Sequence, residues 1–193
     1  MVLTVCLLLP GGEALSAVRF TYGVEWGCLT TFNVAYHRNF DSVSGFRENT
    51  RSMEWMFRGN GEALAHFGLD LGKRFNLSLY SGYSGLMDAR VIPLSLRGTC
   101  FVSRNTELPG WLVFLDSGCN FGTENDEIGI CGKIGTGYRL PLSKRTRLDF
   151  LLAFRISYAD VRFSDEYGPV PPERIRRNDN FASSIAIGIS LAF

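Results

Sequence analysis

Several features that would assign a function directly are scarce in this chain of 193 residues. The net charge is only +1, which gives no electrostatic reason to expect nucleic acid as a partner. Two histidines and five cysteines show no metal-ligand spacing, so we expect neither a metal nor a cofactor. No apolar stretch approaches 18 residues, which excludes a transmembrane helix. If the protein spans a membrane, it must do so as a closed barrel, because an open sheet edge in lipid leaves backbone groups unpaired.

The N-terminal segment has the composition of a secretory signal. Residues 2–9 form a short apolar run, and Ala14, Ser16 and Ala17 supply a small-residue end, although no basic segment precedes the run. We expect residues 1–17 to be a signal peptide. The remaining residues, 18–193, have the length of one domain.

What the chain has in abundance is period-two alternation between large apolar and small or polar residues. In residues 18–27, the even positions are all apolar: Val18, Phe20, Tyr22, Val24 and Trp26. Ten residues of strict alternation are enough for a tilted strand to cross hydrocarbon. The pattern predicts eight strands, at 18–27, 63–72, 76–85, 92–102, 111–121, 128–140, 147–158 and 181–193. The predicted fold class is all-β: an eight-stranded antiparallel up-and-down transmembrane β-barrel.

The polar phase of these strands decides which face meets lipid. A soluble barrel with a ligand pocket would also alternate, but its outer face would carry long mixed polar side chains rather than glycine, alanine and serine. Charged residues also fall in the polar phase: Arg19, Glu25, Asp70, Arg97, Asp116, Lys133, Arg139, Asp149 and Arg155. Turning this phase outward would cost roughly 2–4 kcal/mol for each Arg or Lys at the bilayer midplane. The apolar phase is therefore predicted to touch lipid and the charges to line the lumen.

Two interpretations of the charged lumen remain open. The charges can form an ion-pair network that fills the lumen, because eight strands leave room for little more than side chains. Alternatively, the pairs can exchange partners and open a narrow path for small solutes. Tyr80, Phe101, Leu112, Phe114 and Leu151 also fall in the inward phase, where we expect them to fill the core.

Four stretches carry a family resemblance: FTYGVEWG, LGKRFNLSLYSGY, GKIGTGYRLPLSKRTRLDFLLAFRISY and IAIGISLAF. With them the chain resembles the small bacterial outer-membrane β-barrels, the eight-stranded group related in architecture to the OmpA membrane domain and the OmpX and OmpW-like proteins. The resemblance implies a Gram-negative outer membrane, with its lipid and lipopolysaccharide as surroundings. It also implies a C-terminal insertion signal read by the barrel-assembly machinery: Ile187, Ile189, Leu191 and Phe193. The group includes adhesins, structural proteins, solute channels and enzymes, so the role stays open.

The connections alternate in length. Short turns are expected on one side, at 73–75 and 141–146, and long polar segments on the other, at 28–62 and 159–180. An even strand count then places both termini in the periplasm and the long loops outside. Candidate recognition residues in these loops, for lipopolysaccharide sugars or an unknown surface ligand, are Arg47, Arg51, Trp55, Arg58, Arg174, Arg176 and Arg177.

An enzymatic role has one candidate constellation. Some eight-stranded outer-membrane enzymes that modify lipid A use a histidine with serine or acidic partners, and His66, Asp70 and Ser84 are the residues here that could match. The favoured interpretation is a lumenal histidine bonded to its neighbours. Spacing alone cannot show a triad, since its members meet only in the fold.

The cysteines allow a disulfide in an oxidising compartment, but the register argues against one. Cys6 would leave with the signal peptide. Cys119 and Cys131 flank one hairpin on opposite faces, so we expect these two, with Cys28 and Cys100, to be free thiols that act as small apolar residues.

We therefore expect a non-enzymatic outer-membrane protein with a structural or surface-interaction role. The alternatives are a narrow channel for small solutes and a lipid A-modifying enzyme.

Overall fold

The computed structural model describes residues 18–42, 44–87, 89–103, 106–123, 128–143, 145–159, 164–165 and 168–193. The segment expected to be a signal peptide, residues 1–17, lies outside them. Among the described residues, no helix is both long and apolar enough to cross a bilayer.

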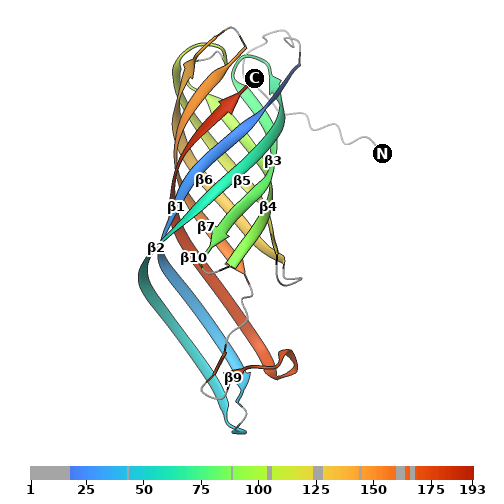
Figure 1. Ribbon diagram of the computed structural model, residues 1–193, viewed down its shortest axis with the longest axis vertical. Coiled ribbons are helices and arrows are strands. Elements are labelled where there is room, and N and C mark those ends of the chain that lie inside the picture. Colours follow the sequence, from blue (N-terminus) through green and yellow to red (C-terminus); the bar gives the residue numbers. More distant parts are fainter. Residues whose placement is uncertain are drawn as a thin grey trace, which may run out of the picture.

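Eight antiparallel strands close into a single barrel, as predicted. Their order around the ring is β1-β10-β7-β6-β5-β4-β3-β2. The strands are β1 (Arg19–Asp41), β2 (Arg47–Leu71), β3 (Phe75–Leu86), β4 (Ala89–Phe101), β5 (Gly110–Gly122), β6 (Ile128–Pro141), β7 (Arg147–Ala159) and β10 (Ile175–Ala192). Two short strands, β8 (Ser164–Asp165) and β9 (Gly168–Pro169), and the 3-10 turn η1 (Pro172–Arg174) precede β10. The tilted strands and the C-terminus at one end of the cylinder are visible in Figure 1.

The barrel closes between its first and last strands. Tyr22 and Phe193 exchange two backbone hydrogen bonds, and their rings stack with centroids 5.6 Å apart. The pairing of β1 with β10 runs from Gly23–Ala192 to Phe40–Ile175. Closure leaves no sheet edge along this part of the barrel.

The strands β3 to β7 match their predicted ranges closely, whereas the predicted long loop at 28–62 was wrong and the one predicted at 159–180 ends earlier, at the start of β10. Most of residues 28–62 belongs to β1 and β2, and β10 begins at Ile175. These segments form a three-stranded extension, which we call the arm: residues 32–41 of β1, 47–58 of β2 and 175–179 of β10. β2 pairs with β3 only from Glu62, and β10 with β7 only from Asn180, so the arm projects past the barrel. Figure 1 shows it at the end opposite the C-terminus.

The arm escaped prediction because its alternation changes phase. The register of β1 shifts between Thr31 and Asn33 against both neighbouring strands, which marks a β-bulge. A bulge reverses which residues share a face, so a single period-two pattern cannot continue through it.

Large apolar side chains cover the outside of the barrel. One residue from each strand illustrates the belt, and each is at least 50% exposed: Trp26, Phe67, Leu79, Leu96, Leu115, Ile134, Leu152 and Ile187. Soluble proteins do not expose a continuous apolar band of this extent. A hydrocarbon layer solvates such a band, so the barrel is a transmembrane one.

The inside is packed with side chains. Phe101, Leu112, Phe114 and Leu151 form a buried cluster with Ala153, and Tyr80 is also buried, which confirms their predicted place in the lumen. A second buried cluster joins Val34, Leu86, Val91 and Ala182 at the base of the arm. Between these two apolar layers lies the polar middle of the barrel.

Candidate functional site

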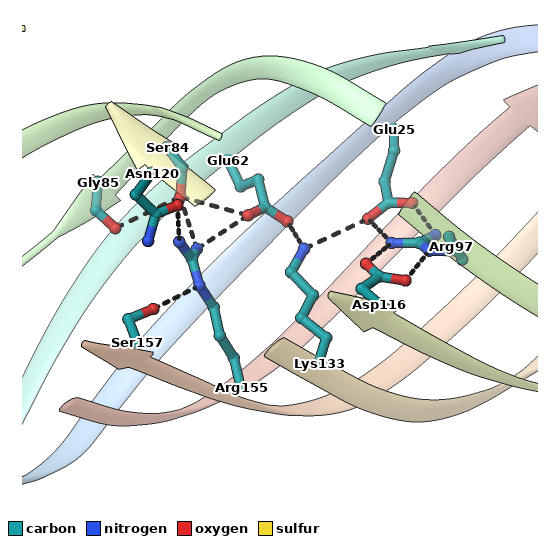
Figure 2. A network of polar contacts seen from close by, with 10 residues as sticks. All are labelled: Glu25, Glu62, Ser84, Gly85, Arg97, Asp116, Asn120, Lys133, Arg155 and Ser157. Carbon is teal, nitrogen blue, oxygen red and sulfur yellow. Dashed lines mark hydrogen bonds and ion pairs between the residues drawn. The ribbon is translucent and has the colours of Figure 1, made fainter. Parts of the chain in front are cut away.

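The middle of the lumen holds a chain of alternating charges, shown in Figure 2. Arg97 on β4 stands between two carboxylates. It donates to Glu25 on β1 at 2.5 and 3.2 Å, and to Asp116 on β5 at 2.6 and 2.9 Å. Its guanidinium also lies over the rings of Tyr80, at 4.0 Å, and Phe114, at 4.4 Å. Arg97 therefore joins three strands and fills the space between two aromatic rings.

Lys133 on β6 links this cluster to the next. Its ammonium contacts Glu62 on β2 and lies 3.8 Å from Glu25. Glu62 in turn accepts from Arg155 on β7 at 3.0 Å and from the hydroxyl of Ser84 on β3 at 3.2 Å. Glu25 and Glu62 each lie between two cations, as Figure 2 shows, whereas Asp116 ends the row beside Arg97.

Arg155 terminates the row on the side nearer the arm. Its guanidinium donates to Ser84 at 2.7 Å, Ser157 at 3.0 Å and Asn120 at 3.4 Å, besides Glu62. The side chain is only 2% exposed. Three hydroxyl or amide groups and one carboxylate thus replace the water that a guanidinium would otherwise bind.

A second set of ion pairs lies toward the end that holds the chain's C-terminus. Arg139 forms a bidentate pair with Asp149, at 2.7 and 2.6 Å, and donates to the backbone oxygen of Thr106 at 2.9 Å. Arg147 donates to Asp70 at 3.4 Å, and Asp70 also accepts from Asn76 at 2.9 Å. Bidentate pairing fixes the geometry of both partners as well as their charge.

The formal charges of the buried lumen cancel. Five cations, Arg97, Lys133, Arg139, Arg147 and Arg155, face five carboxylates, Glu25, Glu62, Asp70, Asp116 and Asp149. Burial of an isolated charge costs several kcal/mol, and the attraction between well-aligned partners offsets this cost. A charge-balanced set of paired side chains can therefore remain buried without water. Removal of one member leaves its partner as an unpaired buried charge, with the full desolvation cost.

Little space remains between these side chains. Two cavities in the lumen measure about 20 and 10 Å³, the first beside His66 and Arg139 and the second beside Glu62 and Lys133. A volume of roughly 10–15 Å³ accommodates one water molecule. Cavities of this size do not accommodate a hydrated ion or an organic solute unless the side chains around them move.

Eight of the nine charges predicted for the lumen are buried there; the exception is Arg19. Arg19 lies at the barrel end, partly exposed, and pairs with the exposed Glu107. The prediction for Arg19 was wrong because it is the first residue of β1, beyond the enclosed part of the barrel.

Two members of the network were missed. Glu62 fell in the segment predicted as a loop, one residue before the expected start of its strand. Arg147 shares its phase with Asp149 and Arg155, so the alternation that identified those residues could have identified it too.

The catalytic candidates are not brought together. His66 stacks on Tyr80 with ring centroids 4.8 Å apart, and its two ring nitrogens have no hydrogen-bond partner among the described residues. Ser84 pairs in register with Glu62, and Asp70 with Asn76, four residues to either side of His66 along β2. At about 3.3 Å per residue, each is roughly 13 Å away along the strand. The expectation that His66 is bonded to its neighbours was therefore wrong, and the three residues form no triad.

The predicted recognition residues lie mostly on strands. Arg47, Arg51, Trp55 and Arg58 belong to β2, Arg176 and Arg177 belong to β10, and Arg174 ends η1. Their assignment to loops was wrong for six of these seven residues. These six residues therefore belong to strands of a β-sheet instead of loops.

The four described cysteines are free. Cys28 is exposed on the outside of the barrel and Cys131 is buried inside. Among the described residues, no group of three or more His, Cys, Asp or Glu side chains could hold a metal ion.

No protein-family model and no curated protein matches the chain. Among solved structures, it is similar to Neisserial surface protein A, with 10% identity and a TM-score of 0.43 over 92% of this chain and 100% of that one. It is similar to the outer membrane protein AlkL, solved by solid-state NMR in lipid bilayers, with 11% identity and a TM-score of 0.41 over 96% and 97%. A de novo designed transmembrane β-barrel matches with 12% identity and a TM-score of 0.39 over 89% and 95%. At these identities and scores the similarities carry no argument about what this chain binds.

Proposed function

We propose that the protein is an integral outer-membrane protein of a Gram-negative bacterium with a structural or surface-interaction role, which it performs through the arm. The observation that carries this proposal is the contrast between the two parts of the molecule. The lumen is filled by a charge-balanced network, whereas the arm extends three strands beyond the barrel. A filled barrel serves as an anchor, and the projecting sheet is the part available to partners.

The orientation follows from how such barrels are built. Long extensions of outer-membrane barrels face outward and short turns face the periplasm. The start of β1, the C-terminal Phe193 and the β2–β3 turn all lie at the end opposite the arm. We therefore place both termini in the periplasm and the arm outside the cell.

The barrel-assembly machinery is the partner proposed for insertion. Ile187 and Ile189 are exposed on β10, which forms the seam with β1, and Phe193 is exposed directly after this strand. With Leu191, also in this phase, they give the terminal strand an apolar outer face that an assembly factor can bind before the barrel closes.

The channel and the enzyme receive less support. A channel requires the buried ion pairs to separate, and the two cavities described beside these pairs are of single-water size. An enzyme of the expected kind requires His66 to meet Ser84 or Asp70, which lie at separate levels of the lumen.

Conductance in planar bilayers tests the anchor against the channel. Purified protein that shows the heat-dependent gel mobility of a closed barrel should produce no unitary current steps, while a porin added to the same bilayer provides the positive control. Steady steps from the folded protein would overturn the proposal.

The orientation has its own test in intact cells. A membrane-impermeant maleimide should label Ser44→Cys in the β1–β2 connection but not Lys73→Cys in the β2–β3 turn, which is the matched control. Label on Lys73→Cys alone would reverse the proposed orientation.

A further inference from the structure

The outward face of the arm carries an open groove of about 560 Å³. Its lining comes from three adjacent strands: Ala35, Tyr36 and His37 on β1, Arg51, Ser52 and Met53 on β2, and Arg177, Asp179 and Phe181 on β10. This volume falls in the range of small-molecule sites, roughly 300–1,000 Å³.

Two rows of side chains cross this groove. Ala35 lies in register between Met53 and Phe181, which makes an apolar row with a small residue in its centre. Two residues farther along β1, His37 lies between Arg51 and Asp179, which makes a polar row. A two-residue step is about 7 Å along a strand, so the polar row lies directly beyond the apolar one.

The apolar row continues the lipid-facing belt of the barrel. The ring of Phe181 packs on that of Tyr158 at 5.0 Å. Nearby, Phe32 on β1 packs on Trp55 of the arm and on Phe154 of β7, both at 6.2 Å. The groove therefore begins where the hydrocarbon-covered surface ends, at the level of lipid headgroups.

The lining of the groove has an excess of positive charge. It contains Arg51, Arg177 and a single carboxylate, Asp179, which accepts from Arg177 and from the hydroxyl of Tyr158 at 2.9 Å. The hydrogen bond from Arg177 holds the pKa of Asp179 below its ordinary value, so this carboxylate stays ionised. Arg51 is exposed and forms no hydrogen bond or ion pair with the described residues.

The other β2 carboxylates of the arm do not offset this charge. Glu48 and Glu54 occupy even positions of β2, on the face opposite Arg51 and Met53. The hydroxyl of Tyr36 donates to Glu54 at 2.8 Å. On β2 the carboxylates and Arg51 thus lie on opposite faces, and the face with Arg51 is continuous with the lipid-facing belt.

We infer that this groove binds one phosphorylated acyl-disaccharide lipid of the outer leaflet, the chemical class of lipid A. An acyl chain lies against Met53 and Phe181, and phosphate groups accept hydrogen bonds from Arg51 and Arg177. Guanidinium groups recognise phosphate through paired N–H donors, which makes arginine well suited to this contact.

The width of the site favours a disaccharide over a glycerol phosphate. Arg51 and Arg177 lie on the two strands that flank β1 and are offset by two residues, since Arg51 pairs with His37 and Arg177 with Asn39, so their backbones are about 12 Å apart. A lipid with one phosphate can pair with both arginines only if the two side chains bend toward each other. A headgroup with a phosphate at each end of two sugars can reach both.

This inference deepens the proposed surface-interaction role and rests on it, because the lipid class follows from the outward orientation of the arm. Binding itself is tested in detergent, where orientation has no influence, and the labelling of Ser44→Cys tests orientation separately. The failure of one is therefore distinguishable from the failure of the other.

Native mass spectrometry of the folded protein with diphosphoryl lipid A provides the test. The wild type should retain one lipid, and Arg51→Gln with Arg177→Gln should weaken retention at least about tenfold, since a hydrogen bond to a charged group is worth roughly one power of ten or more in affinity. Arg145→Gln, exposed at the opposite end, is the matched control for loss of charge and should bind as the wild type does.

Two further variants separate shape from charge. Ala35→Phe fills the centre of the apolar row without a change of charge and should also weaken binding about tenfold. Asp179→Asn removes the one carboxylate of the polar row and releases Arg177, so it should tighten binding. All variants should keep the heat-dependent gel mobility of the closed barrel, because the substituted side chains lie on the surface of the arm.

Three results would overturn the inference. The first is equal retention of lipid A by the wild type and the double arginine variant. The second is equal retention of phosphatidylglycerol, which would mean that any anionic lipid suffices. The third is displacement of lipid A by millimolar inorganic phosphate, which would show a site for free phosphate instead of a lipid.

Discussion

Arg97 is the side chain whose loss should damage the barrel most clearly. In Arg97→Met, Asp116 loses both of its hydrogen bonds from Arg97, and Glu25 keeps only Lys133, 3.8 Å away. All of these side chains are less than 10% exposed, so water does not replace the lost partner. Breaking a buried ion pair on one side costs about 3–5 kcal/mol.

This cost is large relative to the free energy of unfolding of a typical domain. Domains are stable by roughly 5–15 kcal/mol, so Arg97→Met should remove a third or more of the free energy of unfolding of a protein near the middle of that range. The methionine itself should fit, because Arg97 occupies the space between the rings of Tyr80 and Phe114. The loss of stability therefore reports the cost of the unpaired carboxylates and not the cost of a cavity.

A second substitution should restore much of the stability. Arg97→Met with Asp116→Leu leaves four buried cations facing four carboxylates, and Lys133 still reaches Glu25. Replacement of a buried ion pair by apolar residues of similar size is often neutral, so we expect the double variant to lose less than about 2 kcal/mol. Arg97→Lys keeps the charge but not the paired donors, and should fall between, at about 1–3 kcal/mol.

Equilibrium unfolding by urea in phospholipid vesicles measures these differences, with tryptophan fluorescence and heat-dependent gel mobility as signals. The reasoning fails if Arg97→Met lies within about 1 kcal/mol of wild type, since that is the range of an exposed ion pair. It also fails if the double variant is as unstable as the single one, because charge balance would then not be what stabilises the lumen.

Three further predictions concern packing, lipid contact and assembly. A Cβ at Gly118 would overlap the backbone of β4, whereas a Cβ at Gly98 would meet nothing within 4 Å. Urea unfolding should therefore show that Gly118→Ala is less stable than wild type by about 1–3 kcal/mol and that Gly98→Ala is unchanged. Equal stabilities of the two variants would refute the close approach of β4 to Gly118. In vesicles of lipids brominated on their acyl chains, the fluorescence of Trp26 as the sole tryptophan should be strongly quenched. A variant whose sole tryptophan is the lumenal one from Phe114→Trp, with Trp26→Phe, should not be quenched. Equal quenching of the two variants would contradict the assignment of the two faces. Phe193→Ala should lower the amount of folded protein in the outer membrane several-fold yet still allow folding in detergent, and an unchanged amount would disprove the insertion signal.

The strands of the barrel proper were predictable because the two sides of each strand meet unlike surroundings. Trp26 and Ile187 face hydrocarbon, and Arg97 and Asp116 face the lumen, so the physical requirement repeats every second residue. The arm was not predictable in this way. Both of its faces carry polar and aromatic residues, and the bulge near Thr31 shifts the phase between barrel and arm.

Contacts within the lumen depended on the closed ring. Arg155 and Lys133 both contact Glu62. They can do so because the shear of eight strands around the barrel brings these positions of β2, β6 and β7 to one level of the lumen. The separation of His66 from Ser84, by contrast, is set by the register of the β2–β3 hairpin, in which Ser84 pairs with Glu62 and His66 with Tyr80. Sequence spacing holds no information about the contacts of Glu62 with Lys133 and Arg155, because these partners come from strands far apart in the chain.

The sequence by itself determined the number of barrel strands, the face that meets lipid and nearly all of the charges that are buried. It could do so because a charged side chain on the lipid side, or a large apolar one on the lumenal side, costs several kcal/mol. The residue type at each position therefore indicates which side that position faces. Only the tertiary structure decided which cation meets which carboxylate, that the lumen is filled, and that β1, β2 and β10 continue as an arm with one cationic face. These properties arise from distances between strands, which are fixed when the ring closes and are set jointly by all of its strands.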